Sequence, residues 1–103
     1  MEKQFMDKLK IIADKLGFEN QSRQLFEETA ELTVAVNKLL RYGKIQRERR
    51  LQGVITELAD VSIMIEQMKY LLNCQKEVDE EIEFKIDRTI RRLEKNGTNE
   101  KLS

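Results

Sequence analysis

Apolar residues recur at intervals of three or four along most of the chain, which is the spacing of one face of an α-helix. In residues 3–16 this pattern is followed by Gly17, which is predicted to end a first helix because glycine tolerates the left-handed backbone of helix C-termini. A second helix is predicted to reach about residue 42, with Asn20 or Ser22 as its N-cap. The first part of the chain is therefore expected to form two helices.

The remainder of the chain shows the same helical spacing. A basic stretch at residues 41–50 leads into a third predicted helix that ends at about Leu72. A fourth helix is predicted over about residues 76–95, and residues 96–103 are predicted to form a flexible C-terminal tail. We therefore expect an all-α fold with a single domain over residues 1–95.

The length of the chain limits how much of these helices it can bury by itself. At 103 residues one hydrophobic core is expected, and a domain of this size buries only roughly 60% of the surface that its unfolded chain exposes. The charged content of 37% and the absence of proline are typical of helices with charged outer faces. We expect a four-helix-type bundle of antiparallel helices that is completed by oligomerisation.

Charge and composition argue against several kinds of partner and site. Basic and acidic residues number 19 each, so no overall field draws the chain to nucleic acid or to an anionic membrane. No segment approaches about 18 consecutive apolar residues, and the single Cys74 cannot form an intrachain disulfide. We therefore expect a cytoplasmic protein that binds neither nucleic acid nor membrane. The absence of histidine also excludes a histidine general base and histidine ligands to zinc or iron.

Two pairs of carboxylates lie on the apolar faces of the second and third predicted helices. At about 100° per residue, Glu28 falls in the middle of an apolar stripe, and Glu31 lies roughly 60° away and one turn further along. Glu57 and Asp60 repeat this arrangement at an offset of 29 residues, within the similar segments ETAELTVAV and ELADVSIMI. If the two stripes face each other in an antiparallel pair, the four carboxylates converge on one partly buried place.

Such a group of carboxylates predicts a bound cation. Buried carboxylates repel one another unless they take up protons or meet a positive partner. Because oxygen ligands alone are present, a hard ion is expected, with Mg²⁺ first, Mn²⁺ second and Ca²⁺ third. Di-iron carboxylate bundles also place glutamates inward, but they need Glu-x-x-His pairs that this chain cannot supply. The alternative is that both pairs lie on solvated helix faces, the usual setting of such pairs in highly charged chains.

The acidic residues also match a family signature. Glu27-Glu28-x-x-Glu31, followed after 25 intervening residues by Glu57-x-x-Asp60, resembles the EExxE and ExxD motifs of the MazG-like all-α nucleoside triphosphate pyrophosphohydrolases. The resemblance covers roughly residues 22–65 and the rest of the chain loosely, and the small helical chain suits it. It implies a Mg²⁺-dependent enzyme that cuts nucleoside triphosphates between the α and β phosphates and that assembles as a homodimer or homotetramer.

The resemblance also implies a role for each acidic residue. Glu28, Glu31, Glu57 and Asp60 would be the metal ligands, with Glu27, Glu28 and Glu57 as the catalytic group. Four carboxylates carry more charge than one Mg²⁺ cancels, so more than one ion is expected. Glu27 falls roughly 100° from Glu28 on the helical wheel, which places it outside the apolar stripe. Either Glu27 or one of the ligand carboxylates could orient or deprotonate the attacking water.

Cationic side chains are expected near the phosphates of such a substrate. Lys85, Arg88 and Arg92 share a face of the fourth predicted helix, and Lys85 and Arg88 are the first candidates by analogy with the family in this region. The cluster Lys44, Arg47, Arg49 and Arg50 is a second candidate. Both groups are also explained as solvated surface, so the sequence leaves the phosphate ligands open.

Two alternatives to a general nucleotide pyrophosphohydrolase remain at this point. The same acidic motif occurs in relatives directed at phosphoribosyl-ATP, dUTP or dCTP, so the motif does not identify the base or the sugar. The other interpretation is a helical interaction module without enzymatic activity, in which the acidic positions pair with lysine or arginine across an oligomer interface.

Overall fold

The computed structural model describes residues 1–99, and the regular structure in that range is helical. It consists of three helices, α1 (Lys3–Tyr42), α2 (Arg47–Leu71) and α3 (Gln75–Asn99). The all-α prediction is therefore confirmed. Helix α3 continues four residues past its predicted end at residue 95, and residues 100–103 of the predicted tail lie outside the described part of the chain.

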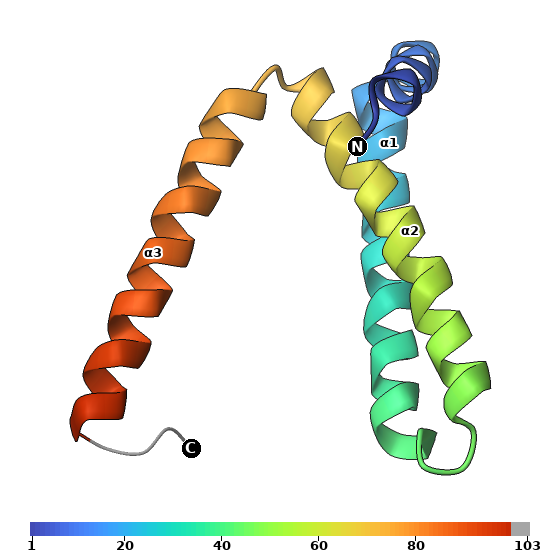
Figure 1. Ribbon diagram of the computed structural model, residues 1–103. Helices are drawn as coiled ribbons and strands as arrows, with labels where there is room; N and C mark the ends of the chain where they lie inside the picture. The colour runs from blue at the N-terminus through green and yellow to red at the C-terminus, as the bar shows by residue number, and fades with distance from the viewer. Residues whose placement is uncertain (100–103) are drawn as a thin grey trace. The chain divides into compact units, whose positions relative to one another are not determined.

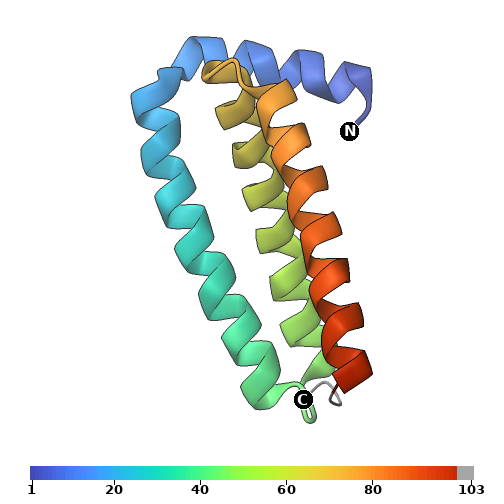
Figure 2. The same ribbon diagram turned by 90° about the vertical axis from the view of Figure 1, so that its left-hand side faces the viewer.

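Helix α1 combines the first two predicted helices and is interrupted at Gly17. The backbone of Gly17 has φ 85° and ψ 163°. Glycine adopts this combination readily because it has no side chain, whereas the side chain of another residue would clash with the backbone there. Residues 3–16 form an N-terminal arm, and residues 18–42 form a second segment that runs in a different direction (Figure 2). The predicted break at Gly17 is confirmed.

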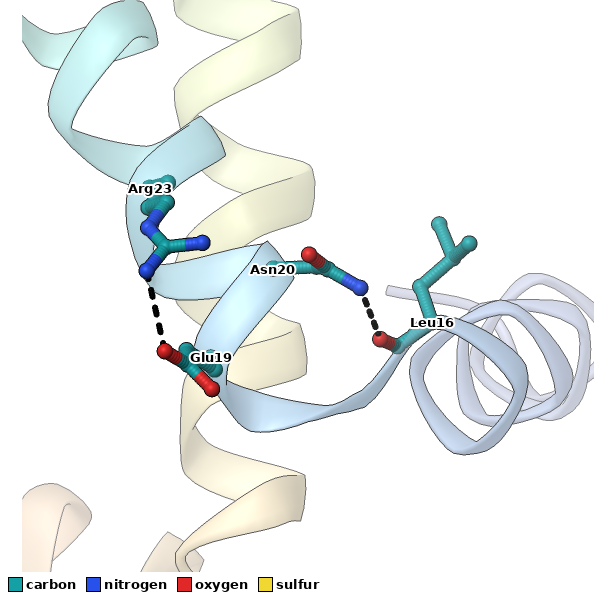
Figure 3. Close-up of polar contacts among 4 residues, drawn as sticks. All are labelled: Leu16, Glu19, Asn20 and Arg23. Carbon is teal, nitrogen blue, oxygen red and sulfur yellow. Dashed lines mark hydrogen bonds and ion pairs between the residues drawn. The ribbon is translucent and has the colours of Figure 1, made fainter.

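The predicted N-cap of the second segment is wrong. Helical structure resumes directly after Gly17, and the side-chain amide of Asn20 donates a hydrogen bond of 2.8 Å to the carbonyl oxygen of Leu16 (Figure 3). Asn20 therefore satisfies an orphan carbonyl of the arm instead of an amide of the next segment. The Ser22 hydroxyl faces α2 and donates to Met68 Sδ at 3.9 Å. An ion pair of 2.9 Å between Glu19 and Arg23 supports the first turn after the kink (Figure 3).

The conformation of Gly17 leads to a stability prediction with a matched control. Gly17→Ala is expected to lower the free energy of unfolding by about 1–3 kcal/mol, because alanine is strained at that φ. Gly53→Ala, inside α2 where an added methyl group would meet no atom within 4 Å, is expected to raise it by about 0.5–1 kcal/mol. Urea unfolding followed by circular dichroism measures both. A Gly17→Ala variant as stable as the wild type would contradict the kink.

The second segment of α1 packs antiparallel against α2 (Figure 1, Figure 2). Residues 43–46 make the turn, in which the Gly43 amide donates to the Leu39 carbonyl at 2.8 Å. The N-terminal arm crosses the other end of α2, where the Tyr70 hydroxyl donates to the Asp14 carboxylate at 2.8 Å. Arm, hairpin and turn form one compact unit of residues 1–73.

The core of this unit is small and partly polar. Its buried apolar side chains are Leu9, Ala13, Val54, Val61 and Met64. Its buried polar side chains are Gln21, Glu28 and Gln67. A helix pair with so few buried apolar groups has little hydrophobic stabilisation of its own, so its polar contacts weigh heavily in its stability.

Helix α3 belongs to a second unit that begins at Cys74. It follows Asn73, whose φ of 52° is the left-handed conformation common just after a helix and tolerated by asparagine. Ile82, Ile86, Ile90 and Leu93 are spaced so that they form one apolar stripe, and each is between 43% and 57% exposed. A single helix cannot bury its own stripe, so this stripe needs another helix to cover it. The four-helix-type bundle and its oligomerisation stay predictions. None of the helices over residues 1–99 is long and apolar enough to span a membrane.

Candidate functional site

Three glutamates meet between α1 and α2. Glu28 and Glu31 are one turn apart on α1 and Glu57 faces them from α2, so that carboxylate oxygens of the three lie within 4.8 Å of one another. The Glu28 side chain is buried, with its residue only 8% exposed, Glu57 is half-buried and Glu31 is exposed. The antiparallel pairing of the two helices produces this convergence, as the helical wheel predicted.

Asp60 completes the group of four predicted ligands. Its half-buried carboxyl group is hydrogen-bonded to Glu28 and is close enough to Glu57 to act on it electrostatically. The structure therefore brings the carboxyl groups of Glu28, Glu31, Glu57 and Asp60 together. We call these four residues the carboxylate cluster.

The cluster raises the pKa of two of its members, Glu28 and Glu57. The hydrogen bond with Asp60 raises the pKa of Glu28 above its usual 4.5, and burial and the charges of Asp60 and Glu31 raise it further. The Gln24 amide, which donates to Glu28 at 3.1 Å, opposes this shift. Burial is the main cause that raises the pKa of Glu57, followed by the charge of Glu31. Each of the causes that raise these pKa values disfavours the ionised form.

The donor set of the cluster fits a hard divalent cation. Glu57 Oε2 is buried and accepts no hydrogen bond within residues 1–99, so a buried oxygen is left without a partner. A cation in contact with that oxygen would provide the partner and offset the mutual repulsion of the carboxylates. Glutamate and aspartate oxygens are the ligands that Mg²⁺ and Mn²⁺ prefer, whereas no sulfur or imidazole ligand is present in the cluster.

The raised pKa of Glu28 predicts an inverted pH dependence of stability in the absence of metal. A pKa that is higher in the folded than in the unfolded chain means that ionisation of Glu28 opposes folding. Its contribution is therefore favourable at low pH and is lost as pH rises above 4.5 and through the folded-state pKa. We expect Glu28→Gln to be more stable than the wild type in EDTA at pH 7, with a smaller difference at pH 5.

Urea midpoints of both proteins at the two pH values measure this difference. Comparison with the variant cancels the exposed ion pairs, such as Lys3 with Asp7, which titrate in both proteins. A stability difference that is unchanged, or larger, at pH 5 would contradict the electrostatic description of the cluster.

A cavity of about 480 Å³ adjoins the cluster between α1 and α2. Glu31 and Glu57 belong both to the cluster and to the cavity wall, so the two features are continuous. The volume lies in the range of small-molecule sites, roughly 300–1,000 Å³. The other wall residues are small or apolar, namely Ala30, Val34, Ala35 and Gly53, or basic, namely Lys38, Arg49 and Arg50.

The remaining predicted site residues lie elsewhere. Glu27 is exposed on α1 beside Glu28 and is not one of the three converging glutamates, as its position on the wheel predicted. Lys85 is exposed on α3, and the half-buried Arg88 guanidinium lies over the Phe84 ring, 5.7 Å from its centroid. Both belong to the second unit, and their assignment to phosphate stays a prediction.

Among the cavity residues that sequence reasoning missed are the basic Lys38 and the small Gly53. Lys38 lies seven residues after Glu31 on α1, and Gly53 lies four residues before Glu57 on α2, so both share a helix face with the cluster. This spacing is the signal that could have identified them. Arg49 and Arg50 belong to the basic stretch that the sequence offers as a second set of candidate phosphate ligands, and Arg50 likewise lies seven residues before Glu57.

No protein-family model, curated protein or solved structure matches the chain. The resemblance to the MazG-like enzymes therefore depends on the acidic motifs and their helical setting. What the structure adds is the proximity of the four motif carboxylates, which lie on two helices and are separated by 25 residues between Glu31 and Glu57.

Proposed function

We propose that this protein is a Mg²⁺-dependent nucleoside triphosphate pyrophosphohydrolase of the MazG-like type. It would cleave (d)NTP between the α and β phosphates and release (d)NMP and pyrophosphate. The observation that carries the proposal is the convergence of carboxylate oxygens of Glu28, Glu31 and Glu57 within 4.8 Å, in hydrogen-bond contact with Asp60. The cavity that continues from Glu31 and Glu57 supports it, because a nucleotide needs room beside the metal ligands.

In this proposal the four carboxylates hold Mg²⁺, or Mn²⁺ in its place. When bound, such ions neutralise phosphate charge and lower the pKa of a bound water. More than one ion is proposed, since the four side chains together exceed the charge of one. Glu28 and Glu57, whose pKa values are raised because their charged forms are disfavoured in the metal-free protein, would be stabilised in the charged form by cation binding. The exposed Glu27 is left to orient or deprotonate the attacking water.

Assembly as a homodimer or homotetramer is part of the same proposal. The apolar stripe of α3 is about half exposed, and Phe26 and Leu40 on α1 are 66% and 81% exposed. Exposed apolar surface of this extent is typical of chains that complete their core by association. A nucleotide-pool housecleaning role in the cytoplasm follows from the proposed reaction and stays a proposal.

The exposed apolar surface equally favours a second candidate, a helical interaction module without enzymatic activity. In that case the acidic positions would pair with basic residues of another chain. The two candidates differ in their response to metal. The enzyme requires Mg²⁺ for turnover and is stabilised by it, whereas the interaction module is indifferent to EDTA in both function and melting temperature.

A nucleotide panel tests the proposed reaction. We expect purified protein to release pyrophosphate from at least one nucleoside triphosphate in the presence of Mg²⁺ or Mn²⁺, and to release none in EDTA. The panel includes the canonical ribo- and deoxyribonucleotides, dUTP, modified nucleotides and phosphoribosyl-ATP, because the motif does not distinguish them. Separate assays for pyrophosphate and orthophosphate identify the broken bond. Orthophosphate alone would show that the proposed bond is wrong, and no release from any substrate would overturn the proposal.

A further inference from the structure

The cavity between α1 and α2 changes charge along its length. Glu31 and Glu57 form its acidic part, and Lys38 lies two turns further along α1. Because α2 runs in the opposite direction, Arg49 and Arg50 lie two turns before Glu57, toward the same α1–α2 turn. Three cations from two helices thus line the cavity on the side of the turn, next to an acidic group that fits a divalent ion.

These three basic side chains are not engaged by acidic partners. In the part of the chain that the structure describes, Lys38, Arg49 and Arg50 form no ion pair with a carboxylate. Arg50 is held in place through Nε, which donates to Gln46 Oε1 at 2.9 Å, and through its guanidinium, 5.1 Å from the centroid of the Tyr42 ring. That arrangement leaves both Nη groups of Arg50 to donate to an oxyanion.

Helix stability does not explain the two arginines. Arg49 and Arg50 lie in the first turn of α2, next to its positive dipole end, where basic side chains are unfavourable by a few tenths of a kcal/mol or more. The same location raises the positive potential that an anion in the cavity would meet. A pair of cations that costs helix stability and lines a cavity is better explained by a bound anion.

Small residues provide the space for such an anion. Ala35 on α1 and Gly53 on α2 lie between the acidic and basic parts of the cavity wall, together with Val34, and a methyl group added to Gly53 would meet no atom within 4 Å. The cavity wall includes Glu31 and Glu57 at one end of this gap and the three cations at the other. A chain of linked phosphates suits this gap, because its oxygens can meet metal at one end and guanidinium and ammonium groups at the other.

The geometry points to Lys38, Arg49 and Arg50 as the polyphosphate-binding residues of this site, with the phosphate chain lying from the carboxylate cluster toward the α1–α2 turn. This inference rests on the proposed function. It assigns the phosphates to the hairpin of α1 and α2 and not to Lys85 and Arg88 of α3.

Binding of inorganic tripolyphosphate to the full chain tests the inference. Calorimetric titration at saturating Mg²⁺ compares the wild type with three variants. One replaces Lys38, Arg49 and Arg50 with alanine. A charge-matched control replaces Arg41, Lys44 and Arg47, which belong to the same hairpin and do not line the cavity. The third replaces Lys85 and Arg88. Mn²⁺ binding without phosphate is measured for each by electron paramagnetic resonance.

We expect the first variant to bind tripolyphosphate at least about tenfold more weakly, since each lost contact is a charge-assisted hydrogen bond. The control and the α3 variant should lose less than about twofold, and Mn²⁺ should bind all four proteins. An equal loss in the charge-matched control, or a loss confined to the α3 variant, would overturn the inference and leave the proposed function standing. Absence of Mn²⁺ binding by the wild type would instead remove the metal site on which the proposed function depends.

Discussion

Glu57→Gln is expected to abolish Mg²⁺-dependent pyrophosphate release while making the metal-free protein more stable. Glutamine has the shape of glutamate but no charge, so the variant loses a metal ligand and keeps the packing between α1 and α2. Loss of a group that merely supports a metal ligand costs about 10- to 100-fold in affinity or activity, and loss of a ligand should exceed about 100-fold. Stability should rise because burial and the charge of Glu31 disfavour the ionised form of Glu57.

The opposite signs of the two effects make the prediction specific. Substitution of a residue that stabilises the fold lowers stability and activity together. Substitution of a residue that binds a cation at a cost to the metal-free fold lowers activity and raises the stability of the metal-free protein. Mg²⁺ should raise the melting temperature of the wild type and have little effect on that of Glu57→Gln. Melting curves with EDTA and with Mg²⁺ measure the metal-free stability and the stabilisation by Mg²⁺, and the pyrophosphate assay measures activity.

Glu83→Gln is the matched control, because it removes one exposed glutamate from α3 with the same chemistry. It should change neither the melting temperature nor the response to metal by a measurable amount. Glu28→Gln should behave as Glu57→Gln does. A Glu57→Gln protein that retains turnover, or that is destabilised in EDTA, would show that the cluster does not bind a catalytic cation.

The carboxylate cluster could be predicted from the sequence because a helix fixes the angle between its side chains. Once residues 25–39 and 54–68 are taken as helices, Glu28 and Glu57 must lie among apolar side chains. Burial of those apolar stripes against each other then brings the acidic groups together without further detail of the fold. In the structure, α1 and α2 pack antiparallel with these two stripes facing each other.

Features that depend on one contact across the helix pair could not be predicted in this way. Asn20 looked like a helix cap, but it bonds to Leu16 because the helix resumes immediately after the kink at Gly17. The sequence pattern around Lys38 does not distinguish it from other exposed lysines, and only the packing of α2 beside α1 makes it part of the cavity wall. In both cases the local pattern allowed two environments, and the path of the chain decided between them.

The buried pair Gln21 and Gln67 is a further contact of this kind, and it carries the largest expected effect on stability. The two residues are 5% and 1% exposed, and the Gln21 side-chain amide donates a hydrogen bond to Gln67 Oε1 across the α1–α2 interface. Gln67→Ala is expected to lower the free energy of unfolding by about 2–4 kcal/mol. It removes buried side-chain atoms and leaves the amide of Gln21 buried without its partner.

The cause of this destabilisation predicts that a second substitution, at the partner glutamine, restores stability. If the loss comes from an unpaired polar group, removing both polar groups together should largely restore stability, since two leucines of similar volume can pack where the amides met. We therefore expect the double variant Gln21→Leu, Gln67→Leu to lie within about 1.5 kcal/mol of the wild type. Each single leucine variant should be less stable than the double variant, because it buries one amide against an apolar side chain.

Urea unfolding of the wild type, the two single leucine variants and the double variant closes a double-mutant cycle and yields the coupling energy of the pair. Gln52→Ala, on an exposed position of α2, is the control for loss of a glutamine and should change stability by no more than about 0.5 kcal/mol. If the changes in free energy of unfolding of the two single variants add up to that of the double variant, the two amides stabilise the hairpin independently. A coupling energy of about 1 kcal/mol or more would show that they act as one interaction and hold α1 and α2 in the register that the carboxylate cluster requires.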